Sequence, residues 1–188
     1  MKKKEEHPII ELLKTFISAG ILAFGIRTFV AEARFIPSSS MEPTLEIDDR
    51  LIIEKISYRF RAPVRGDVVV FSPTDTLKEQ NYNDAFIKRV IGTPGDTVEI
   101  KNGEVYINGK KLTEKYIEEA PNYQFGPEIV PKDHYLVLGD NRNNSYDSHY
   151  WGFVPRDNLI GRATVRFWPL NRLGSLDEKP LYLEQSDK

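Results

Sequence analysis

The segment AFIKRVIGTPGDTVEIKNGEVYINGK, residues 85–110, decides the fold class. It alternates short runs of β-branched and aromatic residues with turn-forming residues, which is typical of strands joined by tight turns. The predicted strands are Phe86 to Thr93, Thr97 to Lys101 and Glu104 to Ile107. Asn102-Gly103, between the last two strands, is a strong signal for a two-residue hairpin, and Asn108-Gly109 repeats it. Consecutive hairpins predict an antiparallel sheet.

The same pattern continues on both sides of this segment, and long helical periodicity is absent from Leu51 onward. Further strands are predicted at Arg50 to Lys55, Asp67 to Ser72, His134 to Leu138 and Asn158 to Trp168. The stretch from about Leu112 to Pro131 is polar, contains prolines and has no clear period, which indicates an excursion from the core. We therefore expect a mainly β protein of antiparallel sheets, with a small inserted lobe at about residues 101–133.

An apolar stretch from about Pro8 to Ala33 precedes the β-rich part. Its charge-free part, Thr15 to Ile26, is too short to cross a bilayer, which takes roughly 20 residues of helix. Lys14 and Arg27 would therefore lie near the two interfaces, with their charged ends reaching outward. We expect one N-terminal transmembrane helix.

Lys2, Lys3 and Lys4 stand before the apolar stretch. The positive-inside rule then places the N-terminus in the cytoplasm and the chain after Arg34 outside. Residues 1–34 would form the cytoplasmic end and the anchor, and residues 35–188 an extracytoplasmic domain.

Two alternatives to an anchor stay open. Ala31-Glu32-Ala33 resembles the small-x-small end of a cleavable secretory signal. Glu11 and Lys14 interrupt the apolar run, as in an amphipathic helix that lies on a membrane or on a partner. Retention is favoured because the strongest chemical motif in the chain begins directly afterwards, at Phe35.

The composition excludes several kinds of site. The 188 residues suffice for one ordinary domain and a short extra segment, and the net charge of −2 gives no indication of a nucleic-acid partner. Without cysteine the chain has neither a disulfide nor a thiolate ligand, and its 3 histidines show no paired spacing that would hold a metal. We expect neither a metal nor a cofactor.

Three clusters carry the chemistry. FIPSSSMEPTL, residues 35–45, has three consecutive serines, which beside proline usually form only a turn. Lys88 lies in an apolar strand that should be buried on at least one face. Such a lysine either points outward and pairs with an acid such as Asp84, Asp96 or Asp140, or loses its hydration, so that its pKa falls and it can accept a serine proton. The polar loop from Gly139 to Pro155, with its aromatic residues, suits the support of such a site.

The blocks SSSMEPTL, GDVVVF, FIKRVIGTPGD and GDNRNNSYDS follow one another in this order. Behind an N-terminal membrane segment, they resemble the ordered blocks of bacterial type I signal peptidases, which are serine proteases with a Ser-Lys dyad. The resemblance runs from the anchor to roughly Pro155. It implies a barrel-like antiparallel β core with a variable inserted lobe, in a single-span protein of the bacterial cell membrane.

The resemblance also implies the catalytic roles. Ser40 matches the nucleophile and Lys88 its general base. The Ser38 hydroxyl and the backbone N–H of Ser40 would form the oxyanion hole. Ser145 matches the serine that hydrogen-bonds to the lysine amine and orients it.

The last block supplies supporting positions. Asp140, Arg142 and Asp147 match supporting residues of the family, and we expect Asp140 to pair with Arg89. The family pattern often has arginine two positions after the aspartate matched by Asp147, where this chain has His149. The supporting ion pair would then be weaker and sensitive to pH.

The implied substrate is the signal peptide of an exported preprotein, cut after a small residue with another small residue two positions before it. Shallow apolar pockets would explain this preference, and the substrate would add to an open sheet edge as an extended strand. The apolar residues expected to line these pockets are Ile36, Pro37, Met41, Leu45, Phe86 and Ile87. The lipid bilayer is the other expected partner.

Three other functions fit parts of the sequence. A Ser-His-Asp hydrolase would use His134 or His149, although no GxSxG elbow is present. A self-cleaving Ser-Lys peptidase of the kind fused to repressors shares the dyad, but it would carry a helix-turn-helix in place of the anchor. A membrane-tethered β module would hold signal sequences without cutting them, and the presence of both proposed catalytic side chains counts against it.

Overall fold

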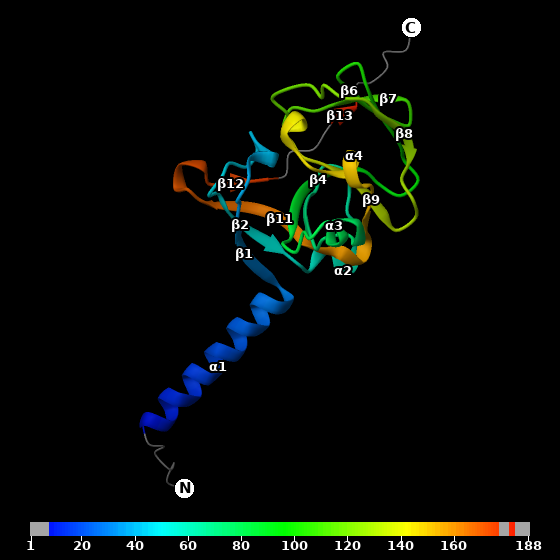
Figure 1. Ribbon diagram of the computed structural model, residues 1–188. Coiled ribbons are helices and arrows are strands. Elements are labelled where there is room, and N and C mark those ends of the chain that lie inside the picture. Colours follow the sequence, from blue (N-terminus) through cyan, green and yellow to red (C-terminus); the bar gives the residue numbers. More distant parts are fainter. Residues whose placement is uncertain (1–7, 177–180, 183–188) are drawn as a thin grey trace.

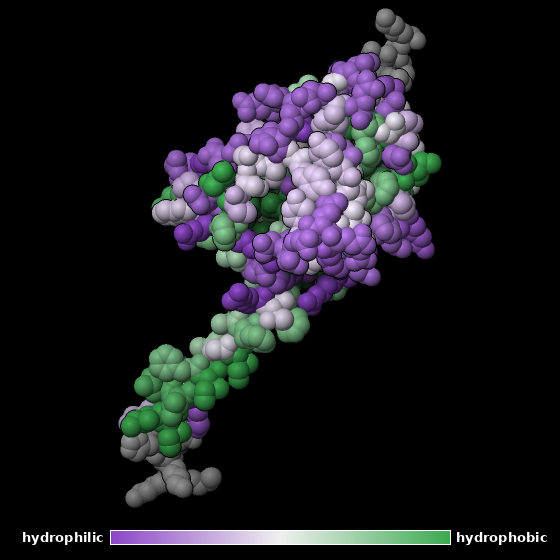
Figure 2. All heavy atoms as spheres, viewed as in Figure 1, coloured by the Kyte–Doolittle hydropathy of each residue, from purple (hydrophilic) through white to green (hydrophobic). Residues whose placement is uncertain are grey.

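A computed structural model describes residues 8–176 and 181–182, so that Lys2 to Lys4 lie outside the described residues. A long helix, α1 (Pro8–Phe29), projects from a body built of strands (Figure 1). None of its 22 residues is buried, and apolar side chains are spread around it rather than gathered on one face. They form the green column in Figure 2. Within the described residues, α1 is the one helix that is long and apolar enough to cross a membrane.

The larger of two antiparallel sheets has the strand order β1-β2-β11-β3-β4-β9-β10, with β12 also paired to β11. These strands are β1 (Ala31–Phe35), β2 (Arg50–Glu54), β3 (Val68–Phe71), β4 (Phe86–Gly92), β9 (His134–Leu138), β10 (Val154–Pro155), β11 (Leu159–Trp168) and β12 (Gly174–Ser175). Register shifts within β4 and β11 bend the strands, and the sheet curls into an open half-barrel. The expected mainly antiparallel β fold is confirmed.

The smaller sheet has the order β13-β7-β6-β5-β8. Its strands are β5 (Thr97–Lys101), β6 (Glu104–Ile107), β7 (Lys110–Thr113), β8 (Phe125–Ile129) and β13 (Leu181–Tyr182). Both predicted hairpins are present, with φ of 53° and 78° at Asn102 and Gly103, and 53° and 76° at Asn108 and Gly109. Positive φ at both positions is the conformation that Asn-Gly adopts most easily. The strand β8 forms within the stretch that has no clear period. It forms there because pairing with β5 provides hydrogen-bond partners for its backbone.

The segment between α1 and the serine motif forms a strand that the sequence pattern does not predict. All five residues of β1 pair with β2, from Ala31 opposite Glu54 to Phe35 opposite Arg50. A single residue, Val30, separates α1 from β1. The strand therefore connects the helix to the serine motif with only one residue between α1 and β1.

Short helices and buried clusters complete the body. The helices are α2 (Ser57–Phe60), α3 (Asp75–Glu79) and α4 (Ser148–Trp151), with the 3₁₀ turns η1 (Ser39–Met41), η2 (Arg142–Asn144), η3 (Arg156–Asn158) and η4 (Leu170–Arg172). The apolar cluster under η1 contains Met41, Leu45 and Leu51, all without solvent exposure. Because Met41 is buried there, its neighbour Ser40 is held firmly on the core.

Candidate active site

Two side chains that are 48 residues apart in the chain meet at the centre of the site. Ser40 lies in η1 and Lys88 in β4. Lys88 Nζ donates a hydrogen bond to Ser40 Oγ at 2.8 Å and another to the backbone carbonyl of Ile87 at 2.9 Å. The amine is therefore within direct proton-transfer distance of the serine hydroxyl.

The Lys88 side chain is removed from water, since only 4% of the residue is exposed. Loss of hydration disfavours the ammonium form and lowers the pKa of Lys88 to about 8. The carboxylates of Asp147 and Asp140 act in the opposite direction, but less strongly than burial. Of the two possibilities for this lysine, desolvation rather than pairing at the surface is the one that the structure shows. An amine with this pKa is partly neutral near pH 7, the state in which it can act as a base.

Ser38 and the backbone of η1 lie beside the Ser40 hydroxyl. Ser38 Oγ is 3.4 Å from Ser40 Oγ, and Ser38 occupies the N-cap position of η1 with extended backbone. The N–H of Ser40 belongs to the first turn of η1, where a helix offers no carbonyl partner. Two hydrogen-bond donors are thus available next to the serine oxygen.

Gly139, directly after β9, brings the polar loop against the serine segment. A Cβ atom at this position would lie 2.4 Å from the backbone oxygen of Ser40 and 2.3 Å from Ser145 Oγ, so no larger residue fits. The next residue but one, Asn141, donates its N–H to the oxygen of Ser40 at 3.2 Å and its side-chain amide to the oxygen of Ser39, also at 3.2 Å. This role of Gly139 was not predicted from the sequence, although a glycine at the end of a buried strand often marks such a close backbone approach.

Arg89 follows Lys88 in β4 and forms the expected ion pair with Asp140, which is confirmed. Arg89 Nε donates to Asp140 Oδ1 at 2.8 Å and Nη2 to Oδ2 at 2.6 Å, and neither side chain is exposed. Thr44 Oγ1 also donates to Asp140 Oδ2, at 2.5 Å. The guanidinium carbon lies 3.9 Å from the ring centroid of Tyr116. This network connects β4 to the segment after Ser40 and to the polar loop.

Arg142 has a partner that was not predicted from the sequence. Its Nη1 and Nη2 atoms donate to the two carboxylate oxygens of Glu114 at 2.7 and 2.5 Å, and its Nε donates to the oxygen of Gly139 at 3.1 Å. Glu114 lies just after β7, in the polar stretch that showed no period. The pair therefore ties the smaller sheet to the glycine that contacts Ser40.

Asp147 holds the same glycine from the other side. Its Oδ2 accepts the N–H of Gly139 at 2.9 Å, and its Oδ1 lies 2.7 Å from Nδ1 of His149. The His149 ring is stacked on Tyr123, with ring centroids 4.0 Å apart. His149 thus occupies the place expected for a partner of Asp147.

Ser145 differs from the expectation. Its Oγ is buried and makes no hydrogen bond to any described residue, so the predicted bond to Lys88 is absent. The Lys88 amine uses Ser40 and the Ile87 carbonyl in its place. The Ser145 side chain fills the space next to Gly139.

A cleft of about 470 Å³ opens onto Ser40 and Lys88. Among the residues predicted to line substrate pockets, Pro37, Phe86 and Ile87 line this cleft. Three others, Ile36, Met41 and Leu45, do not line this cleft; they are 2%, 0% and 0% exposed and belong to the core under η1. Their apolar side chains turn into the core because it offers more complete removal from water.

Aromatic side chains that were not predicted also line the cleft. Tyr82, just before β4, and Tyr146, in the polar loop, both face it. Their ring centroids are 5.7 Å apart, and Tyr82 makes an edge contact with Phe86 at 5.6 Å. They form one wall, which only the folded chain assembles.

Neither histidine proposed for a Ser-His-Asp site contacts Ser40. His134 Nδ1 lies 2.8 Å from the oxygen of Lys132, and His149 Nδ1 faces Asp147. In the part of the chain that the structure describes, no three His, Asp or Glu side chains gather in a way that would hold a metal ion. The amine that contacts the Ser40 hydroxyl belongs to Lys88.

A β scaffold that presents a serine hydroxyl to a buried amine of lowered pKa defines a hydrolase of the Ser-Lys class. Residues 9–168 match the family model described as signal peptidase, peptidase S26. The chain therefore belongs to the signal peptidase family and is a peptidase.

Individual relatives agree with this assignment. The probable signal peptidase I-2 of Synechocystis sp. is 67% identical over 180 residues, which cover 94% of this chain and 83% of that protein. Signal peptidase I of Leptolyngbya laminosa is 64% identical over 181 residues, covering 95% and 89%. Signal peptidase IB of Staphylococcus aureus is 36% identical over 182 residues, covering 86% and 92%.

Proposed function

We propose that this chain is a membrane-bound serine endopeptidase that removes N-terminal signal peptides from exported preproteins. The observation that carries the proposal is the 2.8 Å contact between Ser40 Oγ and the buried Nζ of Lys88. The relatives support the substrate class, because they are named as signal peptidases and their alignments cover most of the length of both chains.

Lys88 in its neutral form takes the proton of Ser40 while Oγ attacks the carbonyl carbon of the scissile bond. The tetrahedral intermediate collapses, the C–N bond breaks, and Lys88 returns the proton to the leaving amine. Water then attacks the carbonyl carbon of the acyl-enzyme while Lys88 accepts its proton, the C–O bond to Ser40 breaks, and Lys88 returns the proton to Ser40 Oγ. A pKa of about 8 leaves roughly a tenth of the lysine neutral at pH 7, which is sufficient for a base that recovers its neutral state in each cycle.

The Ser38 hydroxyl and the Ser40 N–H are the donors we propose for the oxyanion of the tetrahedral intermediate. Each such donor typically contributes a few kcal/mol to the stability of the transition state. Support comes from their position beside Ser40 Oγ, with Ser38 Oγ at 3.4 Å. The contacts of Gly139 with Ser40 and Asp147 keep the donors in place relative to β4.

The start of β4 is the edge to which we propose the substrate adds. The neighbouring strand β9 pairs with β4 only from Arg89 onward, whereas β3 covers the other edge from Phe86. Residues 86–88 therefore keep one edge free of strand partners, beside the Ser40 cleft. A signal peptide in extended conformation fits there, with its small residues against Pro37, Phe86 and Ile87.

We propose that α1 spans the membrane, with residues 1–34 as the N-terminal end and anchor and residues 35–188 as the extracytoplasmic catalytic domain. The length and apolar surface of α1 support this arrangement. Retention of the anchor is supported by β1, because Ala31-Glu32-Ala33 is paired with β2 and would have to leave the sheet before it could be cut. Glu32 also forms ion pairs with Arg34 and Lys55.

The experiment that tests the proposal is cleavage of a preprotein by the full chain in detergent. Ser40→Ala and Lys88→Ala should each lower the rate by about 10³-fold or more, and Lys88→Arg should do the same because guanidinium stays charged. The matched control Lys78→Ala, on the surface of α3, and the variant His134→Ala should cut at the rate of the unaltered chain. Retained cleavage by Ser40→Ala or Lys88→Ala would refute the dyad, and loss in His134→Ala would favour the histidine mechanism.

A further inference from the structure

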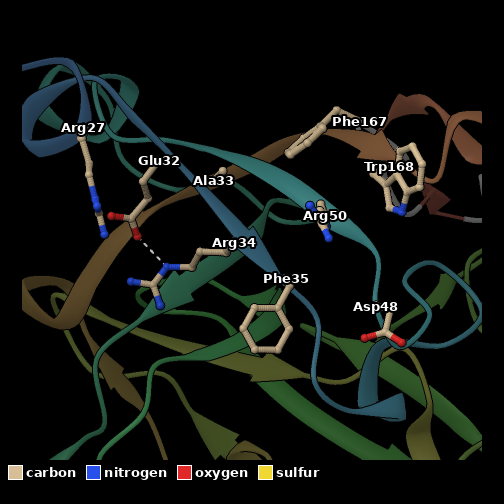
Figure 3. A pocket seen from close by; sticks show the side chains of 9 residues that line it. All are labelled: Arg27, Glu32, Ala33, Arg34, Phe35, Asp48, Arg50, Phe167 and Trp168. Carbon is tan, nitrogen blue, oxygen red and sulfur yellow. Dashed lines mark hydrogen bonds and ion pairs between the residues drawn. The ribbon is translucent and has the colours of Figure 1, made fainter. Parts of the chain in front are cut away.

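A cavity of about 690 Å³ lies where α1 meets the larger sheet (Figure 3). Its walls come from the last turn of α1, from β1, from the start of β2 and from the end of β11. It shares no lining residue with the cleft at Ser40. The proposed catalytic steps therefore leave this cavity without a role.

Positive charge dominates the cavity. Three arginines, Arg27, Arg34 and Arg50, line it. Arg34 Nε donates to Glu32 Oε1 at 2.5 Å, and Lys55 Nζ donates to Glu32 Oε2 at 2.7 Å, so this carboxylate already balances two cations. Figure 3 shows the Arg27 side chain reaching toward the same carboxylate from the other side.

The remaining charges leave a surplus of guanidinium groups. Asp48 is the second carboxylate in the lining, and Figure 3 places it at the far end from Arg27. Within residues 8–176, the side chains of Arg27 and Arg50 form no ion pair with a carboxylate. Two exposed guanidinium groups that line one hollow favour an anion, and guanidinium matches the geometry of phosphate oxygens.

The cavity lies at the end of α1, the level expected for the lipid headgroups if α1 spans the membrane. Arg27 is in the last turn of α1. A helix of 22 residues is about 33 Å long, close to the thickness of about 30 Å of a bilayer's hydrocarbon core. With α1 spanning the membrane, Arg27 and the cavity next to it fall in the headgroup layer.

Aromatic side chains beside the arginines suit the same layer. Phe35 is 65% exposed and Trp168 is 47% exposed, and both line the cavity. Tryptophan is enriched at membrane interfaces, because its ring contacts apolar chains while its N–H stays in a polar environment. Arginines with exposed rings at the end of an apolar helix thus form surroundings for a molecule that is anionic at one end and apolar at the other.

We propose that this cavity binds the headgroup of an anionic membrane lipid, with Arg27 and Arg50 contacting the phosphate and the acyl chains lying along α1. The inference rests on the proposed membrane span of α1. A lipid bound there holds the start of β1 at the bilayer surface. Because β1 leads directly to the serine motif, the lipid fixes the height of Ser40 above the membrane.

Trp168 provides a direct probe of the site. The chain has 2 tryptophans, and the other, Trp151, is buried in the core, so Trp151→Phe leaves one reporter in the cavity. We would insert the full chain into phosphatidylcholine nanodiscs and raise the fraction of phosphatidylglycerol. Trp168 emission should change in a saturable manner. The variant Arg27→Gln/Arg50→Gln should weaken the apparent affinity about 30-fold, because two basic groups contribute about 1 kcal/mol each at a membrane surface.

The matched control is Arg59→Gln. Arg59 is exposed and also lies near the end of α1, over the ring of Phe29, but it does not line the cavity. The Arg59→Gln variant should bind phosphatidylglycerol with the same apparent affinity as the unaltered chain. Native mass spectrometry should detect retained phosphatidylglycerol on these two proteins, but not on Arg27→Gln/Arg50→Gln. If binding came only from the general attraction of a basic surface to anionic lipid, Arg59→Gln would lower the apparent affinity as much as the double variant does. That result would overturn the proposal.

Other results would also overturn it. An equal response to phosphatidylcholine alone would exclude a site selective for anionic lipid, and saturation by inorganic phosphate in detergent would show an ion site in place of a lipid site. Preprotein cleavage in detergent by Arg27→Gln/Arg50→Gln should continue at the normal rate, since neither residue touches the dyad. If the unaltered chain cut no preprotein at all, the proposed function would fail, while the lipid titration would still decide this inference.

Discussion

Lys88 and Arg89 are consecutive residues of β4 that point to opposite faces of the sheet, and both are almost completely buried, at 4% and 0% exposure. Arg89 donates to both carboxylate oxygens of Asp140, whereas Lys88 donates to a hydroxyl and a backbone carbonyl. Burial alone lowers the pKa of either side chain. Asp140 reverses the effect for Arg89, whose pKa is raised, while the pKa of Lys88 falls to about 8. The difference teaches that burial does not decide the charge of a side chain unless its partner is also known.

The two faces of β4 therefore have different functions. On one face a buried ion pair keeps a permanent charge and links the strand to the polar loop. On the other face Lys88 donates to uncharged groups, and burial outweighs the more distant carboxylates of Asp147 and Asp140, so that the amine can change its protonation state. Three predictions test this division, in order of decreasing effect.

Breaking the ion pair should have the largest effect on stability. Asp140→Ala leaves the Arg89 guanidinium buried without its carboxylate, which should cost about 3–5 kcal/mol of the free energy of unfolding. Urea denaturation of the full chain in detergent would measure the loss. The double variant Arg89→Met/Asp140→Leu, which removes both charges, should recover most of it. A loss below about 1 kcal/mol in Asp140→Ala would contradict a structural role for this pair.

Removing the reactive amine should stabilise the protein while it abolishes cleavage. Between pH 8 and 10.5 the folded chain holds fewer protons on Lys88 than the unfolded chain does, so stability from this group rises with pH. At pH 7, Lys88→Met should therefore add about 3 kcal/mol to the free energy of unfolding, and the gain should disappear above about pH 10.5. Lys78→Met, at an exposed position, should change stability by less than about 0.5 kcal/mol at either pH. Destabilisation by Lys88→Met at pH 7 would show that the amine is not held against a desolvation cost.

The pH dependence of cleavage should show the smallest change. The rate should rise with pH up to a plateau, with its half-point near pH 8, because the neutral form of Lys88 is active. Asp147→Asn removes a carboxylate that raises the pKa of Lys88, so the half-point should move to lower pH, by up to about one unit. His149→Gln keeps the carboxylate and should leave the half-point in place. Movement of the Asp147→Asn profile to higher pH would contradict this electrostatic assignment.

The parts of the fold that depend on local sequence were predicted well. Thr97–Lys101, Glu104–Ile107 and His134–Leu138 are strands with the predicted bounds. Apolar runs and Asn-Gly turns act within a few residues, so they can be recognised without knowing the rest of the chain. The strand β1 was missed, because its short AEARF sequence has no strong strand signal and is ordered by pairing with β2.

The candidate site was predicted in part. Ser40 and Lys88 were singled out together through the family resemblance, and the structure brings them into contact. Glu114 and Gly139 were missed, since one lies in a stretch without a period and the other acts through its backbone. For the substrate pockets, apolar character alone could not separate Phe86, which lines the cleft, from Met41, which is buried in the core.

The sequence by itself determined an antiparallel β protein behind an apolar helix, with a serine motif and a lysine in a buried strand. These features follow from residue type and spacing, which act locally. Only the tertiary structure decided which charges survive burial, because the pKa of a buried group depends on the distance to partners from distant parts of the chain. Lys88 and Arg89 are neighbours in sequence, and their different chemistry comes from the presence of Asp140 on one face of β4 and of Ser40 on the other.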